Sequence, residues 1–251
     1  MPAELLRRMG DVLPNAEAHT PYGMTECLPV ADIDLMGIDG AGLGNGVCVG
    51  TAAPGVRISI APLDGVAGDI TGEILVDAPH RKDHYDRLWW TERRSSTSDG
   101  WHRTGDVGHF DAAGRLWIEG RLVHLITTAD GIVTPVGIEQ ACERVDSVEL
   151  AAAVGVGPSG TQQLVVVVQV SGVTPGLAAA QLAAAVRAAV GSGRSVAAVL
   201  VTAKLPVDIR HNSKIDRAAV AAWASEVLAG GSADAIAPGT WATRLIAKVG
   251  R

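Results

Sequence analysis

The sequence lacks the features on which several classes of protein depend. Its three cysteines stand at wide spacings with no Cys-x-x-Cys pair, which argues against a disulfide framework and against a zinc site. No apolar run approaches the roughly 18 to 20 residues that span a bilayer, and the first residues lack the order of a signal peptide. Lysine and arginine are scattered rather than clustered for phosphate binding. These absences predict a reduced, cytoplasmic protein with no membrane span and no nucleic-acid partner.

What is present is a globular composition. The chain has 251 residues, of which 47% are hydrophobic and 19% charged, with a formal net charge of −6. That length suits one large domain or two modest ones. No heptad or triplet repeat is sustained, so a coiled coil and a collagen helix are excluded. Only 4% of the residues are aromatic, which limits the surfaces available for stacking without deciding what is stacked.

The sequence pattern of the amino-terminal part is typical of short strands joined by turns. A helix is expected at residues 4–9 and a strand at 18–21, ahead of further strands at 56–60 and 72–76 where polar and apolar residues alternate. Residues 105–119 predict a hairpin around the turn chemistry of Asp111 to Gly114. This part of the chain therefore favours an antiparallel or mixed sheet.

The pattern changes after Gly120-Arg121 to an alternation of strands and helices. The predicted elements are strands at 122–128, 151–156, 164–170 and 196–202, and helices at 135–145, 177–190 and 215–228. They make an α+β unit of about 110 residues, a usual domain size. We expect three regions, at 1–119, 120–230 and 231–251, the last a tail whose role the sequence does not indicate.

One motif is misleading in isolation. Gly155-Val156-Gly157-Pro158-Ser159-Gly160 matches the G-x-G-x-x-G pattern of dinucleotide-binding turns and follows a predicted strand. A β-branched run comes next, so a strand and not a helix N-terminus follows the glycines. The segment is predicted to be the turn of a hairpin.

Tyr22-Gly23-Met24-Thr25-Glu26 combines three groups that suit a nucleotide. An aromatic face can stack on a base, a hydroxyl can bond a phosphate oxygen, and a carboxylate can hold Mg²⁺ between phosphates. The same residues also suit an ordinary corner between a strand and a loop. The motif alone leaves both interpretations open.

A second polar segment runs from Trp101 to Asp106. Gly105 permits a close backbone approach, and Asp106 is of the type that accepts two hydrogen bonds from a ribose diol. A turn aspartate is the plainer alternative. Gly120-Arg121 ends the predicted hairpin and brings a guanidinium towards the same region.

The last segment is a polar loop that ends at a predicted helix start, with Asn212 or Ser213 as a plausible cap. Lys214 stands there against the helix dipole, which favours acidic residues at that end. The cation therefore has some other role, or it is a solvated surface lysine.

Taken together and in this order, the four segments resemble the carboxyl-terminal half of adenylate-forming enzymes, the superfamily of acyl-CoA synthetases, luciferases and peptide-synthetase adenylation domains. The resemblance implies an α/β and α+β fold: the end of a large AMP-binding domain, with a mixed sheet and a small β-barrel-like subdomain, followed by a small α+β domain. It also implies ATP or AMP as the nucleotide and Mg²⁺ as the metal.

The resemblance assigns a role to each motif residue. Tyr22, with Gly23 and Met24 beside it, would pack on adenine, Thr25 would bond the α-phosphate, and Glu26 would support Mg²⁺. Asp106 would hold the ribose hydroxyls, and Arg121 would lie beside the nucleotide. Lys214 would bridge the carboxylate and the α-phosphate, stabilising charge as pyrophosphate leaves.

Departures from the family pattern narrow the resemblance. Leu122-Val123-His124 replaces the acidic pair that follows Gly-Arg in most relatives, which puts the usual hinge and thioester formation in doubt. Residues 207–215 are similar to those of olefin β-lactone synthetases, which adenylate a β-hydroxy fatty acid and close it without coenzyme A. His211 or His124 is a candidate base for the hydroxyl proton.

The family's phosphate-gripping loop lies far upstream of the Tyr-Gly-x-Thr-Glu motif, and only 21 residues precede Tyr22 here. We therefore expect a truncated or split ligase whose missing amino-terminal half is a possible partner chain. A fragment of a fatty acyl-CoA ligase, using coenzyme A, is one alternative. A non-catalytic remnant that binds AMP-like ligands or another protein is the other.

Overall fold

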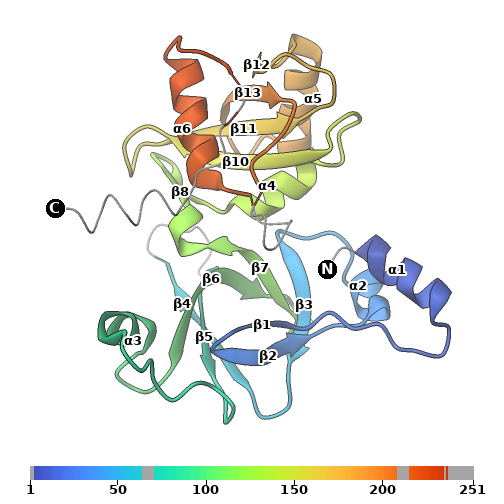
Figure 1. The fold of residues 1–251 in the computed structure, drawn as a ribbon, viewed down its shortest axis with the longest axis vertical. Coiled ribbons are helices and arrows are strands. Elements are labelled where there is room, and N and C mark those ends of the chain that lie inside the picture. The colour runs from blue at the N-terminus through green and yellow to red at the C-terminus, as the bar shows by residue number, and fades with distance from the viewer. Residues whose placement is uncertain (1–2, 64–70, 208–214, 235, 237–251) are drawn as a thin grey trace. The chain divides into compact units, whose positions relative to one another are not determined.

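The computed structural model describes residues 3–63, 71–207, 215–234 and 236. Its contacts divide the chain into two compact units, Met1–Val123 and His124–Arg251, which are described separately (Figure 1). None of the described helices is both long enough and apolar enough to cross a bilayer.

The first unit is built on a seven-stranded sheet in which every neighbouring pair is antiparallel. The strand order is β1-β2-β3-β7-β6-β5-β4. The strands are β1 (Tyr22–Met24), β2 (Cys27–Asp32), β3 (Val47–Ala52), β4 (Arg57–Pro62), β5 (Gly72–Asp77), β6 (His102–Phe110) and β7 (Leu116–Arg121). Within the described residues this order is open, with β1 and β4 at its edges.

The sheet nevertheless curls back on itself. β1 and β6 are four positions apart in the strand order, which in a flat sheet means about 19 Å at the usual strand spacing. Yet the hydroxyl of Tyr22 on β1 lies 2.7 Å from the carboxylate of Asp106 on β6. One core cluster likewise joins Val30 of β2 to Ile74 and Val76 of β5. Curling thus gives a barrel-like interior without a closing strand pair.

The predicted hairpin in this unit is confirmed. β6 and β7 pair with Phe110 opposite Leu116, and the turn between them is held by Asp111, whose Oδ1 accepts from the amides of Ala113 and Arg115 at 2.9 Å each. An aspartate that bonds backbone amides two and four residues ahead is a strong local turn signal. The strands predicted at 56–60 and 72–76 are also present, as β4 and β5.

The strand predicted at 18–21 is wrong. Only His19 forms an isolated bridge there, with Asp34, and the regular strand begins one residue after Pro21, which has no amide hydrogen to donate. The described residues of this unit also form three helices, α1 (Ala3–Val12), α2 (Leu35–Ala41) and α3 (Trp89–Ser95). The first contains the helix predicted at 4–9, whereas the other two were not predicted.

The second unit has a mixed four-stranded sheet of order β10-β11-β13-β12. β11 and β13 are parallel, and the other two pairs are antiparallel. Its strands are β10 (Leu150–Val156), β11 (Gln163–Gln169), β12 (Gly176–Leu177) and β13 (Val196–Thr202), and its helices are α4 (Pro135–Cys142), α5 (Ala180–Val190) and α6 (Arg217–Leu228). A separate hairpin joins β8 (Ile126–Thr128) to β9 (Gly131–Val133).

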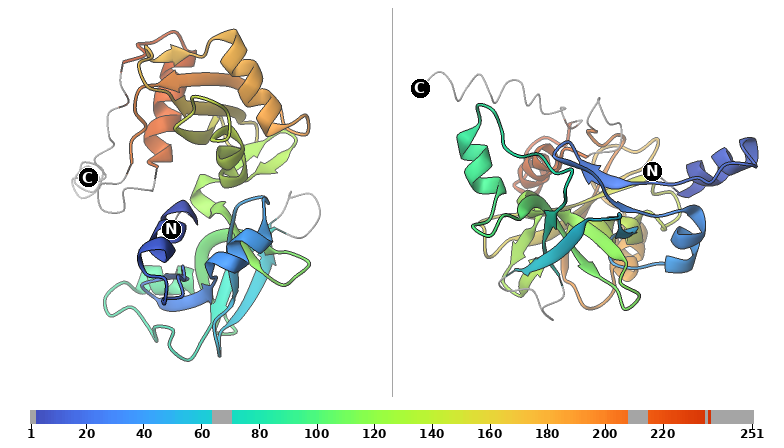
Figure 2. Two further views of the ribbon diagram at one scale, coloured as in Figure 1. Left: turned by 90° about the vertical axis from the view of Figure 1, so that its right-hand side faces the viewer. Right: turned by 90° about the horizontal axis from the view of Figure 1, so that it is seen from below.

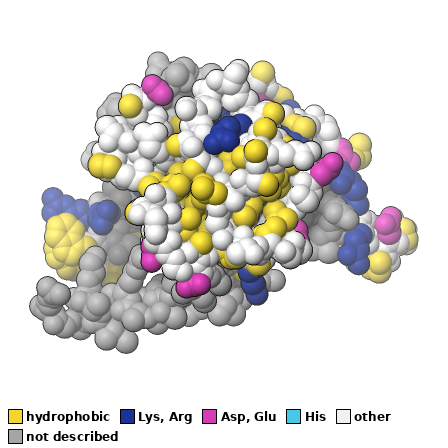
Figure 3. Space-filling model, turned by 90° about the horizontal axis from the view of Figure 1, so that it is seen from above, with side chains coloured by type: hydrophobic (Ala, Val, Ile, Leu, Met, Phe, Trp, Pro, Cys, Tyr) yellow, Lys and Arg dark blue, Asp and Glu magenta, His cyan; other side chains and the backbone are white. Residues whose placement is uncertain are grey.

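Helices cover both faces of this sheet (Figures 1 and 2). Val166 of β11 packs in one core cluster with residues of α4 and α5, while its neighbour Val167 packs in a second cluster with residues of α6. A strand covered on both faces has no solvent side to mark with polar residues, which explains the continuous apolar run of β11. On the face seen in Figure 3, charged side chains are sparse among hydrophobic and uncharged ones.

The hairpin interpretation of the glycine-rich motif is confirmed, because Val156 of β10 pairs with Gln163 of β11 across it. Two other predictions need correction. Residues 122–128 are not one strand: a 3₁₀ turn, Leu122–His124, precedes β8. The helix predicted from 177 begins at Ala180, because Gly176–Leu177 pairs with β13 instead.

The cap of α6 also differs from the prediction. Asn212 and Ser213 lie outside the described residues, and the helix begins at Arg217 behind Asp216. The Asp216 carboxylate accepts from the amide of Ala219 at 3.0 Å. An acidic cap suits the positive end of the helix dipole.

Candidate functional site

Tyr22, Asp106 and Arg121 meet in the first unit although the chain separates the first two by 84 residues. The Tyr22 hydroxyl donates to Asp106 Oδ2 at 2.7 Å, and Arg121 Nε lies 3.0 Å from Asp106 Oδ1. The β6–β7 register places Asp106 directly opposite Arg121. Three strands, β1, β6 and β7, therefore supply one aromatic ring, one carboxylate and one guanidinium to a single cluster.

The backbone that leads into Asp106 is held by Thr104. The Thr104 hydroxyl donates to Ile74 O at 2.9 Å and accepts from the Asp106 amide at 3.0 Å. Gly105 between them has φ +71°, a conformation that other residues adopt at a cost. A Cβ atom added at Gly105 would have no neighbouring atom nearer than 3.5 Å. Gly105 is therefore required for the backbone turn and not for space.

The electrostatics of this cluster define its protonation. Burial, and then the charge of Asp106, raise the pKa of the Tyr22 phenol well above its ordinary value. The phenol is consequently a neutral donor throughout the physiological range. The side chain of Asp106 is 18% exposed and that of Arg121 is 54% exposed, so a ligand can reach both.

A second cluster lies at the other end of β1. Thr25 and Glu26 form the turn between β1 and β2, where Met24 pairs with Cys27. Thr25 is exposed, and Glu26 is half-buried. The Tyr85 hydroxyl donates to Glu26 Oε1 at 2.5 Å. The turn thus presents a hydroxyl and an oriented carboxylate beside each other.

Gly23 makes this arrangement possible. A Cβ at Gly23 would lie 2.8 Å from Cys27 O and 3.2 Å from the Cα of Leu28. Since backbone atoms cannot give way cheaply, any side chain here would push β1 away from β2. Met24 lies on the core side, packed against the cluster that contains Val30 and Ile74.

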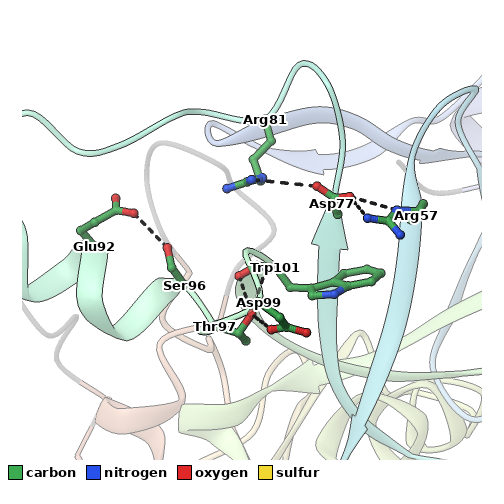
Figure 4. Close-up of polar contacts among 8 residues, drawn as sticks. All are labelled: Arg57, Asp77, Arg81, Glu92, Ser96, Thr97, Asp99 and Trp101. Atoms are coloured by element: carbon green, nitrogen blue, oxygen red, sulfur yellow. Dashed lines mark hydrogen bonds and ion pairs between the residues drawn. The ribbon is translucent and has the colours of Figure 1, made fainter.

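Tyr85 is held by a network centred on Glu92 of α3. Lys82 Nζ donates to Glu92 Oε2 at 2.7 Å, and the Tyr85 amide donates to the same oxygen at 3.0 Å. Ser96 donates to Glu92 Oε1 at 2.9 Å, as Figure 4 shows. The hydrogen bond from Lys82 leads the causes that lower the pKa of Glu92 to about 2. Glu92 therefore stays ionised and fixes the loop before α3.

The Glu26–Tyr85 pair is tuned by its surroundings. Burial by itself raises the pKa of Glu26, but the hydrogen bond from Tyr85, a backbone hydrogen bond and the nearby charge of Lys82 together lower it by more, so the pKa lies below the ordinary value. Burial and the bond to Glu26 raise the pKa of Tyr85 to about 12. At neutral pH the carboxylate is charged and the phenol is its donor.

Sequence reasoning missed Tyr85, Lys82 and Glu92, because nothing near them in the chain marks them as partners of Glu26. It also passed over His102, which is 2% exposed and whose Nδ1 has no hydrogen-bond partner in the described part of the chain. Burial lowers the pKa of His102. The histidine is thus neutral at physiological pH.

The remaining predicted site residues are not part of these clusters. Lys214 and His211 lie outside the described residues. His124 ends the 3₁₀ turn Leu122–His124 and opens the second unit. Among the described residues no group of three or more histidine, cysteine, aspartate or glutamate side chains is placed to hold a metal.

We expect Tyr85→Phe to raise the pKa of Glu26. The substitution removes the donor that favours the ionised carboxylate and leaves the burial that favours the neutral acid. The folded-state pKa of Glu26 is depressed, so this group adds stability above its unfolded pKa and loses it as the pH falls. In the variant the folded-state pKa lies closer to the unfolded one, so this acid-side loss is smaller and is complete at a higher pH. An NMR titration of the Glu26 carboxyl carbon measures the change.

Tyr22→Phe is the matched control, because it removes a phenol hydroxyl of β1 that donates to Asp106 and not to Glu26. In Tyr22→Phe, the titration curve of Glu26 should coincide with that of the unaltered chain. An unchanged Glu26 pKa in Tyr85→Phe would contradict the assigned hydrogen bond.

Comparison with known proteins finds no matching family model. Among curated proteins, the chain is 36% identical to the olefin beta-lactone synthetase of Xanthomonas campestris pv. campestris, over 90% of this chain and 46% of that protein. It is 34% identical to the olefin beta-lactone synthetase of Stenotrophomonas maltophilia, over 91% and 46%. The indoleacetate–CoA ligase of Aromatoleum aromaticum is 34% identical over 53% of this chain and 26% of that protein.

Solved structures with a similar fold are also found. The amide bond synthetase McbA from Marinactinospora thermotolerans superposes with a TM-score of 0.67 at 27% identity, covering 82% of this chain and 41% of that one. ATP-bound MatB from Rhodopseudomonas palustris gives a TM-score of 0.69 at 22% identity, covering 90% and 44%. The chain spans about half the length of the curated relatives it matches. In sequence and in fold, the chain therefore matches the carboxyl-terminal part of an adenylate-forming enzyme.

Proposed function

We propose that this chain supplies the nucleoside-binding residues of an enzyme that activates a carboxylic acid with ATP. The observation that carries the proposal is the meeting of Tyr22, Asp106 and Arg121 from three strands. In this proposal the Tyr22 ring packs on adenine, Asp106 accepts from the ribose hydroxyls, and Arg121 lies beside the nucleotide. The names of the curated relatives, two olefin beta-lactone synthetases and an indoleacetate–CoA ligase, support this assignment.

The turn between β1 and β2 is assigned to the phosphates. Thr25 is exposed and its hydroxyl suits the α-phosphate. Glu26 is the one residue proposed here for Mg²⁺. A single oriented, ionised carboxylate fits this ion, because Mg²⁺ in nucleotide enzymes is held by one or two carboxylates, substrate phosphates and water rather than by a protein cage. When bound, the metal neutralises phosphate charge.

The first chemical step is adenylation. A carboxylate oxygen of the acid attacks the α-phosphorus of ATP, the new P–O bond forms, and the bond to pyrophosphate breaks. Negative charge increases on the departing pyrophosphate and around the α-phosphorus. Lys214 is assigned to stabilise that charge.

The second step is proposed to be intramolecular. The β-hydroxyl oxygen of a β-hydroxy fatty acid attacks the acyl carbon, the acyl–oxygen bond to AMP breaks, and a β-lactone forms. A tethered nucleophile benefits from high effective concentration. The hydroxyl proton passes to a base, for which His211 and His124 are the proposed residues. The two relatives that cover 90% and 91% of this chain support this product.

Product analysis tests the function. The chain is combined with the amino-terminal half of either β-lactone synthetase relative, and supplied with a β-hydroxy fatty acid, ATP and Mg²⁺. We expect a product lighter than the acid by one water, together with AMP and pyrophosphate, with no need for coenzyme A. Lys214→Ala should reduce AMP release on the order of a hundredfold.

A thioester that forms only with added coenzyme A would favour fatty acyl-CoA ligation instead, as the indoleacetate–CoA ligase among the relatives suggests. If the chain binds neither AMP nor an acyl-adenylate mimic, the nucleotide assignment is wrong and a non-catalytic role remains. Substituting His211 and His124 together separates the base assignment from adenylation: lactone formation should fall while AMP release persists.

A further inference from the structure

The segment around α3 exposes large apolar side chains that no other described element covers. Leu88, Trp89 and Trp90 are 57%, 62% and 58% exposed. The two indole rings stack with their centroids 4.4 Å apart. Tryptophan is costly to leave in water, and a neighbouring pair of them on a surface indicates an interaction site.

Basic residues flank this apolar group. Arg93 lies over the Trp90 ring at 6.0 Å, and Arg94 is exposed beside it on the same helix. Neither arginine joins an ion pair within the described part of the chain, whereas Arg87 is paired with Asp86 at 3.4 Å. Residues three and four positions apart share a helix face, so Trp90, Arg93 and Arg94 point the same way. Figure 3 shows hydrophobic side chains flanked by Lys or Arg at the left edge, the side on which α3 lies in Figure 1.

The side of the helix turned away from Trp90 and Arg94 is already anchored. Glu92, two residues from each of them and so on the other side of the helix, accepts from Lys82, from the Tyr85 amide and from Ser96. A helix held by this network cannot turn its outer face inwards without breaking these bonds. The exposed face is therefore a fixed feature of the first unit and available to a partner.

We propose that Leu88, Trp89, Trp90, Arg93 and Arg94 form a peripheral contact for an anionic lipid bilayer. Indole rings favour the boundary between headgroups and acyl chains, and arginines favour anionic headgroups. The two kinds of side chain lie on one short helix with the polar anchors beneath it. This is a surface contact and not a span, and it is independent of the nucleotide assignment.

Vesicle co-sedimentation with the full chain tests the proposal. The probes are vesicles of phosphatidylcholine alone and of phosphatidylcholine with phosphatidylglycerol. We expect binding to the anionic vesicles that weakens as salt is added. Trp89→Ser/Trp90→Ser should lower the partition coefficient at least about tenfold. Arg93→Glu/Arg94→Glu should remove the preference for phosphatidylglycerol while the protein stays folded.

Met36→Ser/Leu43→Ser is the matched control, because those side chains are also apolar and are 83% and 80% exposed. That variant should bind as the unaltered chain does. Equal binding by the tryptophan variant, or no binding by the unaltered chain, overturns the proposal. Sedimentation velocity distinguishes a second copy as the occupant: self-association that disappears in Trp89→Ser/Trp90→Ser also overturns it. Unfolding midpoints of all variants confirm that none has lost its fold.

Discussion

Asp106→Ala is expected to lower the affinity of the chain for AMP by about a hundredfold. The carboxylate would accept from both ribose hydroxyls, and hydrogen bonds to charged groups contribute about 1.5 to 3 kcal/mol each. Losing about 3 kcal/mol of binding free energy corresponds to two powers of ten in Kd. The variant also removes the ionic partner of Arg121 and the acceptor of the Tyr22 hydroxyl. Calorimetric titration with AMP, repeated with an acyl-adenylate mimic, measures the loss.

Two controls separate binding from folding. Tyr22→Phe keeps the ring that packs on adenine and removes only its bond to Asp106, so its loss should be smaller, about tenfold or less. Asp77→Asn alters an aspartate that pairs with Arg57 on the exposed side of neighbouring strands (Figure 4) and should leave binding unchanged. Equal Kd values for Asp106→Ala and Asp77→Asn would rule out the ribose assignment.

Glu139→Ala is expected to lower the free energy of unfolding of the second unit by about 3 to 5 kcal/mol. Glu139 of α4 is 6% exposed and accepts from Arg217 of α6, with the Arg217 Nε 2.9 Å from Oε1. Its Oε1 also accepts from the Ala153 amide of β10 at 3.0 Å. Removing the carboxylate leaves a guanidinium that is only 17% exposed without its partner. The cost comes mainly from that uncompensated charge.

Urea unfolding followed by tryptophan fluorescence measures this effect, because Trp223 contributes to the signal from a buried position in α6 against the same sheet. Arg57→Met breaks a pair whose arginine is 71% exposed and should cost less than about 1 kcal/mol. Glu139→Met/Arg217→Met replaces both charges with apolar chains and should recover most of the loss. A cost for Glu139→Ala as small as that for Arg57→Met would contradict the buried-pair account.

Local sequence patterns predicted much of the secondary structure correctly. The alternation in β4 and β5, the Asp111 turn and the apolar run of β11 each depend on residues only a few positions apart, and each was predicted correctly. The glycine-rich motif at 155–160 was also interpreted correctly, because the residues that follow it decide whether a helix or a strand comes next. Near-neighbour chemistry is sufficient for such elements.

The incorrect or missing predictions concern segments whose secondary structure depends on tertiary contacts. α3 begins at Trp89, directly after Leu88, without an apolar periodicity, and the contacts of Glu92 with Lys82 and Tyr85 hold it in place. Residues 122–128 look like one strand, yet only 126–128 find a partner, in β9. A strand needs a neighbour, and the sequence does not indicate which neighbour is within reach.

By itself, the sequence determined the two-part organisation of strands followed by alternating strands and helices, and the identity of the polar motifs at Tyr22–Glu26, Asp106 and Arg121. Only the tertiary structure decided that these motifs meet. Tyr22 reaches Asp106 because the sheet curls through the four steps that separate β1 from β6. Tyr85 likewise reaches Glu26 across 59 residues of chain. The first contact depends on the accumulated curvature of a whole sheet and the second on a loop held by Glu92 of α3, and no short stretch of residues encodes either.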